Sequence, residues 1–372
     1  MGKVNVIIGK QSSGKSCVLK TACYCSWVEK RIELAQSVEE FSEEDAFIVD
    51  MARYYDMAGY VHSDTYIEYE TSHLMFCYDN ASKTFEMKWK SGHWNYKRPK
   101  ISYVPADRNM VAALPTWKSL ELDGNMLEFM SDWDKARKFM KKEENFLNLG
   151  MSYIYDSRTN TDSIKLGMND KTLMLKESSS GIQSLLPMYV HIDYLSTGQY
   201  KDTNTNTKIS YAQREEYKSL RDTIYHNQYE KKRPKEDSSV IMAMEDGGYY
   251  RFADKKDGLR FRRTYRNYVM THHSEIFLEE PEDNLFPPTQ CQFVDWLLAA
   301  AKKHKDMLFI ATHSPYILNQ LIKNDPKGLT VFFTHVADDE TRRCSVRQLS
   351  EEEVGEFYGN GVDMFFNFEQ YL

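Results

Sequence analysis

The chain lacks a long hydrophobic run. No apolar stretch approaches the roughly 18 residues that would suggest a membrane-spanning helix, and Met1-Gly2-Lys3 leads at once into a strand pattern. Positive charge is not in excess either, because 48 lysines and arginines stand against 55 acidic residues, for a formal net charge of −7. This balance argues against a uniformly basic nucleic-acid-binding body, although it leaves room for a local basic groove. We therefore expect a cytoplasmic protein with no membrane partner.

Cysteine is sparse and poorly spaced for metal binding. The six cysteines, at positions 17, 23, 25, 77, 291 and 344, include one C-x-C pair but no pair of C-x-x-C hooks. Reduced core thiols are thus expected, rather than a zinc site or a disulfide framework. With 372 residues, 41% of them apolar, the chain can form one large α/β domain with an insertion, or two domains.

What the chain does contain, directly behind the apolar run 4–8, is a phosphate-binding loop. The segment Gly9-Lys10-Gln11-Ser12-Ser13-Gly14-Lys15-Ser16 has the spacing G-x4-G-K-[ST], and a helix pattern follows it. In such a loop the glycines turn backbone N–H groups toward a phosphate, the lysine reaches the β and γ oxygens, and the serine ligates Mg²⁺. The predicted nucleotide-binding residues here are Gly9, Gln11, Ser12, Ser13, Gly14, Lys15, Ser16 and Cys17.

Two further segments supply the groups that an ATPase needs. The apolar run 276–278 ends in Glu279 and Glu280, and Pro281 cannot extend a central strand, so both carboxylates are expected at a strand's C-terminal end. Glu279 is predicted to hold Mg²⁺ through its water shell, and Glu280 to polarise the attacking water. A strand at 307–311 then closes on His313, which can reach the γ-phosphate.

Small residues at Ser179, Ser180 and Gly181 precede a helix-like apolar run. They predict either a serine turn that caps the helix or a close approach of the helix N-terminus to an anion. Arg108, at the end of a short strand, is compatible with a phosphate site or with a surface salt bridge. Two basic groups have both a binding interpretation and a solvated one: Lys135, Arg137, Lys138, Lys141 and Lys142, and then Arg260, Arg262, Arg263 and Arg266.

The remaining patterns predict the organisation of the chain. Segments 65–70, 74–78 and 84–89 indicate an antiparallel meander, 240–252 a hairpin, and 202–237 a protruding insertion. We expect a single head made of an N-terminal lobe (1–115), a helical and charged insertion region (116–237) that contains the serine-glycine segment 178–183, and a C-terminal lobe (238–372).

In this order the P-loop, the serine-glycine signature, the paired acids and the strand-terminal histidine resemble the ABC-type ATPase heads of the SMC and RecF-like kind. More narrowly, Ser179-Ser180-Gly181, Glu279-Glu280-Pro281-Glu282 and Thr312-His313-Ser314 look like the OLD-like ATPases, several of which serve in bacterial anti-phage systems. The resemblance implies an α/β P-loop fold with a mixed sheet, an antiparallel β subdomain and helical insertions.

The family's chemistry can be carried over residue by residue. The resemblance implies that ATP and Mg²⁺ bind between two head-to-tail copies, with Glu280 as catalytic base, Lys15 and His313 at the γ-phosphate, and Ser16 and Glu279 at the metal. Ser179, Ser180 and Gly181 would act on the nucleotide of the partner copy. The segment Glu282-Asp283-Asn284 stands where a dimer-contacting loop would be. This chain departs from the family by having Phe286 where OLD-like chains often have His, and Glu279 in place of Asp.

OLD nucleases also carry a Toprim nuclease domain after the ATPase, and no metal-binding acidic constellation follows His313 here. The resemblance therefore predicts an ATP-hydrolysing, dimerising switch that controls a separate effector protein, in anti-phage defence. Two alternatives stay open: a non-hydrolysing scaffold that uses ATP to cage a toxin-like partner, and a DNA-repair head that binds nucleic acid through the arginines near 260–266.

Overall fold

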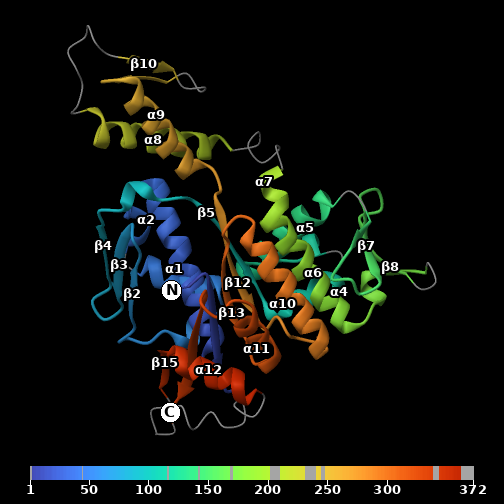
Figure 1. Cartoon of the computed structure of the whole chain (residues 1–372). Helices are drawn as coiled ribbons and strands as arrows, with labels where there is room; N and C mark the ends of the chain where they lie inside the picture. The colour runs from blue at the N-terminus through green and yellow to red at the C-terminus, as the bar shows by residue number, and fades with distance from the viewer. Residues whose placement is uncertain are drawn as a thin grey trace.

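A computed structural model describes residues 2–43, 45–114, 117–140, 143–167, 171–201, 210–230, 240–243, 248–337 and 343–361. Its centre is a six-stranded sheet with helices on both faces, and a smaller lobe stands away from this body at the top of Figure 1. The sheet order is β15 (Cys344–Gln348), β14 (Leu329–Val336), β1 (Val4–Gly9), β13 (Met307–Ala311), β12 (His273–Glu279) and β5 (Pro99–Val104). Every pair is parallel except β14 with β15.

Both faces of the sheet are buried because apolar side chains point alternately to each. From β12, Ile276 and Leu278 enter one core, whereas Phe277 enters the other and stacks on Phe309 of β13. The helix α1 (Lys15–Ala35), with the short helices α2 (Glu39–Ser42) and α3 (Ala46–Tyr54), covers the face of Phe277. The opposite face is covered by α6 (Ser180–Asp193), α10 (Pro287–Lys302) and α11 (Pro315–Asn324).

Two antiparallel sheets flank this core, and a third lies in the smaller lobe. The meander consists of β2 (Tyr66–Glu70), β3 (Leu74–Asp79) and β4 (Thr84–Trp89), as predicted. The second sheet consists of β6 (Glu144–Asn145), β7 (Met151–Asp156), β8 (Thr161–Leu166) and β9 (Thr172–Met174), and the third of β10 (Val240–Ala243) and β11 (Tyr249–Phe252). The predicted α/β class with a mixed sheet, antiparallel β structure and helical insertions is thus confirmed.

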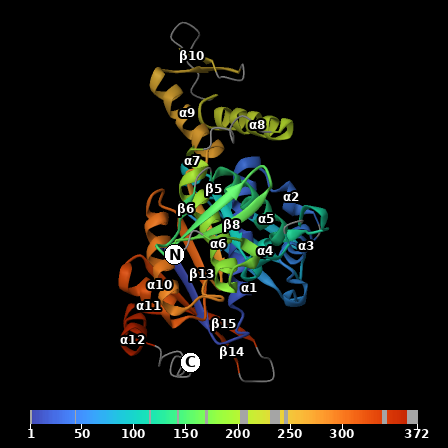
Figure 2. The same cartoon turned by 90° about the vertical axis from the view of Figure 1, so that its right-hand side faces the viewer.

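The projecting lobe is formed by α8 (Tyr211–Gln228), the β10–β11 hairpin and α9 (Lys255–Val269), and it stands out from the body in both views (Figures 1 and 2). It has its own aromatic core, in which Phe261 packs against Tyr225 and Phe252. The hairpin strands confirm the prediction, whereas its turn at 244–247 and the basic run Lys231 to Lys235 lie outside the described residues. The chain enters this lobe after α7 (Gln199–Lys201), and it returns from α9 directly into β12 of the central sheet.

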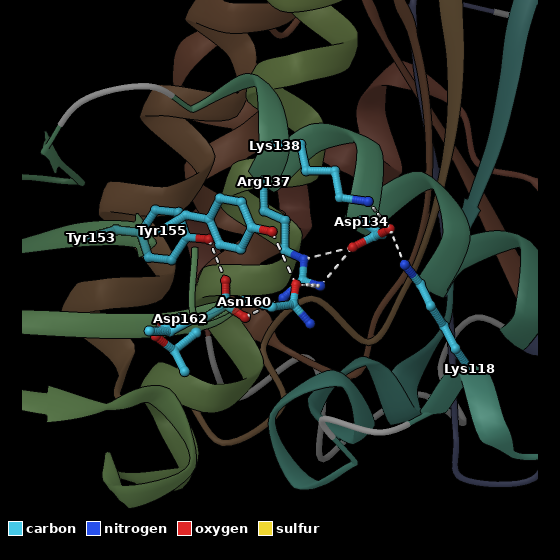
Figure 3. A network of polar contacts seen from close by, with 10 residues as sticks. Lys118, Asp134, Arg137, Lys138, Tyr153, Tyr155, Asn160 and Asp162 are labelled. Carbon is cyan, nitrogen blue, oxygen red and sulfur yellow. Dashed lines mark hydrogen bonds and ion pairs between the residues drawn. The ribbon is translucent and has the colours of Figure 1, made fainter. Parts of the chain in front are cut away.

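The charged helix α5 (Gly124–Phe139) makes ion pairs within the chain. Arg137 is buried and bonds Asp134 on its own helix and Asp162 on β8, each at 2.6 Å, while Tyr155 lies alongside its guanidinium (Figure 3). Lys138 also pairs with Asp134. The expectation of a solvated helix face is therefore wrong for Arg137, which joins α5 to the β7–β8 hairpin. Lys141 and Lys142 lie outside the described residues.

Changing Arg137 to Met is expected to destabilise the fold by about 3 to 5 kcal/mol, because Asp162 then stays buried without its cation. The matched control is Lys135→Met, two residues away on the same helix. Lys135 is 66% exposed and pairs with Asp132, so the control should cost less than about 1 kcal/mol. Urea unfolding followed by circular dichroism measures both, and equal losses would contradict this account of the network.

Two further findings concern the remaining helices. The segment after β15 forms the helix α12 (Glu351–Asn360), which begins with a capping box from Ser350 and packs on α11. The short helix α4 (Met110–Ala113) completes the described helices. None of the helices in the described part of the chain is long and apolar enough to cross a membrane.

Candidate active site

Three neighbouring strands end at one edge of the central sheet. The P-loop follows β1, His313 follows β13, and Glu279 and Glu280 lie at the end of β12, with β13 between the other two strands. Backbone bonds hold the ends level, since the amide of Thr312 donates to the carbonyl of Ile7 and that of Glu280 to the carbonyl of Ala311. This arrangement brings together the predicted loop, carboxylates and histidine at the C-terminal edge of the sheet. Ligands of open α/β sheets bind at this edge.

The loop geometry fits a phosphate. Gly14 is the N-cap of the 21-residue helix α1 and has a φ of 90°, a conformation that favours glycine. No side chain caps this helix start, so its first amides are left to meet an anion. Gly9 is required for another reason, because a Cβ there would lie 2.3 Å from the hydroxyl oxygen of Thr334 on β14.

Lys15 is folded into the loop in this structure. Its Nζ donates to the carbonyl oxygens of Gly9, at 3.1 Å, and of Lys10, at 2.8 Å. Burial lowers the pKa of Lys15 to about 8, while the carboxylates of Glu280 and Glu282 oppose that shift. The ammonium group is thus held by two carbonyl oxygens that a phosphate can replace, close to the acids at the end of β12.

Glu280 and His313 form the central pair of the site. The Nε2 atom of His313 lies 3.1 Å from Oε1 of Glu280, and both side chains are about one-third exposed, so water and substrate can reach them. The hydrogen bond with His313 lowers the pKa of Glu280, which keeps this carboxylate ionised and able to accept a proton. Glu280 also has a φ of 43°, an uncommon conformation for this residue type that occurs often at functional sites.

Glu279 makes its side-chain contact with the neighbouring strand. Its carboxylate accepts a hydrogen bond from the hydroxyl of Tyr103 on the neighbouring strand β5, which leaves further lone pairs for a ligand. Ser16, in the first turn of α1, is half-buried. A hydroxyl and a carboxylate are oxygen donors of the kind Mg²⁺ prefers, so these residues fit the predicted metal role, which stays a prediction.

Glu282 is engaged within the chain. It accepts hydrogen bonds from the Thr312 hydroxyl, at 2.8 Å, and from the His313 amide, at 2.5 Å, and burial raises its pKa. It therefore fixes the loop that carries His313, and its contact with a second copy stays a prediction. Asn284 is the exposed residue of this turn and has a φ of 60°.

Arg108 differs from both sequence-based interpretations. Its side chain is completely buried and donates to backbone carbonyls alone: those of Glu279 and Glu280, those of Pro105 and Ala106, and that of Ser184 on α6. Burial lowers the pKa of this guanidinium. Arg108 serves neither as a surface ion pair nor as a phosphate ligand, and it positions the backbone of both acids against α6.

The serine-glycine segment lies at the start of α6. Ser179 is its N-cap residue, yet its side chain makes no capping hydrogen bond, so the simple capping-serine interpretation is not supported. Ser179 and Ser180 are exposed. A Cβ on Gly181 would lie 2.8 Å from the carbonyl oxygen of Asn284, which makes this glycine necessary for close packing and puts the helix start beside the turn after Glu280.

Sequence reasoning missed several supporting residues. The Ser13 hydroxyl bonds that of Thr334 at 2.6 Å, the Cys344 thiol contacts the Ser13 carbonyl, and Ser314 bonds Gln290. These contacts come from strands and helices far away in the sequence, so no local pattern could have indicated them. Tyr103 could have been suspected, since its strand was predicted and ends just before Arg108.

The arginines of α9 lie elsewhere. Arg262, Arg263 and Arg266 line a cavity of about 630 Å³ together with His272 and His304, and Arg260 is not on its lining. The two histidines precede β12 and β13, so the cavity lies at the sheet edge opposite the P-loop. Among the described residues, no acidic side chain lines it, and this chemistry suits an anion. Its link to nucleic acid stays a prediction.

Comparisons with known proteins give limited similarity. No protein-family model matches the chain, and no curated protein matches its sequence. Among solved structures it is similar to the SMC head domain from Thermotoga maritima, with 8% identity, a TM-score of 0.38, and coverage of 93% of this chain and 90% of that one. A Smc head domain with an extended coiled coil, bound to the C-terminal domain of ScpA and derived from Pyrococcus furiosus, has 8% identity, a TM-score of 0.36 and coverages of 96% and 92%. Identities and TM-scores this low assign neither a function nor a partner to this chain, so its function is inferred from the geometry of the site.

Proposed function

We propose that the chain is an ATPase of the ABC type, in which ATP binds at the P-loop and Glu280 activates the attacking water. The observation that carries this proposal is the pair formed by Glu280 and His313, 3.1 Å apart, at a strand end close to Lys15. An ionised carboxylate that is held by one partner and still partly exposed has the properties of a general base.

Each residue of the site would have a distinct task. The ammonium of Lys15 and the first amides of α1 balance charge on the β- and γ-phosphates, while Glu280 takes the proton of the water that attacks the γ-phosphorus. Ser16 and Glu279 would hold Mg²⁺, which neutralises phosphate charge when bound. His313 would orient the Glu280 carboxylate, and its side chain is likewise partly exposed.

We further propose that the complete site needs two copies of the chain. The exposed Ser179 and Ser180 at the uncapped start of α6 offer hydroxyl and amide donors to an anion, and the turn at Asn284 lies beside them. ATP would then favour a closed dimer and hydrolysis would release it. Control of a separate effector, in phage defence, extends this proposal and has its support in the sequence resemblance alone.

Mixing two inactive variants tests the shared site. Lys15→Ala should lose the phosphate cradle and Ser179→Arg should block the partner's nucleotide, so each alone should show almost no ATP turnover. An equimolar mixture should recover about a quarter of wild-type turnover, because half of the dimers are then mixed and each mixed dimer has one intact site of two. Phosphate release from the pure and mixed proteins is the measurement. A mixture as inactive as its components, with both variants folded, would refute the shared site.

A further inference from the structure

A cluster of buried acidic and imidazole groups lies away from the ATPase site, at the far end of α1. Glu29 and Glu33 are four residues apart and so occupy one face of this helix, against the meander. His73, in the turn between β2 and β3, completes a group whose ligand atoms all lie within 4.8 Å of one another. No step of the proposed ATPase mechanism uses these side chains.

Glu33 is the unexplained member of this cluster. Its side chain is completely buried, and neither carboxylate oxygen has a hydrogen-bond partner among the described residues. The Tyr268 hydroxyl donates to the backbone carbonyl of His93 instead, and Nε2 of His93 stays 3.9 Å from Glu33. Burial, with the charge of Glu29 adding to it, raises the pKa of Glu33 to about 9, although the nearby side chains of Tyr268 and Gln36 oppose that shift. A carboxylate in this position needs a proton or a cation.

The neighbours of Glu33 are arranged as ligands of a metal commonly are. Nδ1 of His73 is hydrogen-bonded to Oε1 of Glu29 at 3.2 Å in this structure, and this distance is also close to the roughly 3.3 Å between two ligands that each stand 2.0 to 2.1 Å from a tetrahedral ion. The hydroxyls of Tyr69 and Thr71 donate to Glu29, at 2.8 and 2.7 Å, and orient its carboxylate. His73 is 24% exposed, which gives an ion a way in.

We propose that Glu29, Glu33 and His73 bind a divalent transition-metal ion, with Zn²⁺ as the first candidate. Two carboxylates and one imidazole suit Zn²⁺, Mn²⁺ or Fe²⁺ better than Ca²⁺ or Mg²⁺, which prefer oxygen ligands throughout. The ion would join the P-loop helix to the meander, and it is independent of the nucleotide and of its Mg²⁺. The Tyr96 hydroxyl, also buried without a partner and with its ring against His73, is available to orient a ligand or a bound water.

Metal binding to the full chain tests this proposal. Protein stripped with a chelator is titrated with Zn²⁺ in excess Mg²⁺, which keeps the P-loop site saturated, and bound zinc is counted after gel filtration. We expect one Zn²⁺ per chain, a rise in melting temperature on loading, and visible absorption bands when Co²⁺ replaces Zn²⁺. Glu33→Gln and His73→Ala should each weaken binding by at least about 100-fold.

Two controls separate this site from others. Ser16→Ala alters the P-loop, and His226→Ala removes an exposed imidazole on α8, so both should bind Zn²⁺ like wild type. Since Glu33 is buried and its change can disturb folding, His73→Ala at a partly exposed position carries the test independently, with circular dichroism to verify the fold. Either of two results would overturn the proposal: no stoichiometric zinc in the folded wild type, or wild-type affinity in His73→Ala.

Discussion

Replacing Glu280 with Gln is expected to lower the steady-state rate of ATP hydrolysis by about 100- to 10,000-fold. The amide has the same size as the carboxylate but cannot accept a proton from water, so the chemical step slows. Binding of ATP should change little, because the phosphate contacts come from the P-loop and not from Glu280. The affinity for ATP should stay within about threefold of wild type, and a variant that binds but does not hydrolyse should accumulate as the closed dimer.

The matched control is Glu86→Gln, the same chemical change at an exposed position on β4. It should leave turnover and affinity unaltered. Phosphate release gives the rate, a fluorescent ATP analogue gives the affinity, and analytical ultracentrifugation gives the oligomeric state. If wild type and Glu280→Gln both fail to hydrolyse ATP and yet assemble on adding it, the non-hydrolysing scaffold becomes the better account.

The elements at the active site could be predicted from local sequence because their signals are local. A phosphate loop requires a strand before it and a helix after it, and both lie within 35 residues of the N-terminus. The acids and His313 close two apolar strands, and parallel strands necessarily present their C-terminal ends at one edge. The meander and the β10–β11 hairpin likewise follow from alternating side chains.

Contacts between distant segments could not be predicted in this way. Arg108 and Arg137 appear in the sequence as ordinary charged residues, and their burial depends on carbonyls and carboxylates that other elements supply. The inward turn of Glu282 depends on the His313 loop thirty residues later. Each of these charged side chains was expected at the surface or at a ligand, and each instead positions a neighbouring segment. The reason is that a buried polar group forms hydrogen bonds with whatever partners the fold brings to it.

Arg108 gives the second large expected effect. Changing it to Met removes hydrogen bonds to five backbone carbonyls in three segments, and those carbonyls that have no second donor are left buried and unpaired, whereas the carbonyl of Glu280 keeps the amide of Asp283. Each carbonyl left unpaired costs about 1 to 3 kcal/mol. Removing the charged guanidinium also removes the free-energy cost of burying it, which offsets part of this sum. We therefore expect a net loss of about 3 kcal/mol in the free energy of unfolding. Arg53→Met is the matched control: Arg53 is 76% exposed and, within the described part of the chain, pairs with Asp50 on its own helix, so this change should cost less than about 1 kcal/mol.

Catalysis should fall as well, and for a geometric reason. Because Arg108 holds the carbonyls of Glu279 and Glu280 against α6, its loss frees the strand end that carries Glu280, the proposed general base. We expect kcat to drop by about 10- to 100-fold at a temperature well below the melting point, with the KM for ATP nearly unchanged. Arg108→Lys should not restore the rate, since a single ammonium cannot reach carbonyls in three segments. Loss of stability with an unchanged kcat in the folded variant would show that Arg108 supports the fold without positioning the acids.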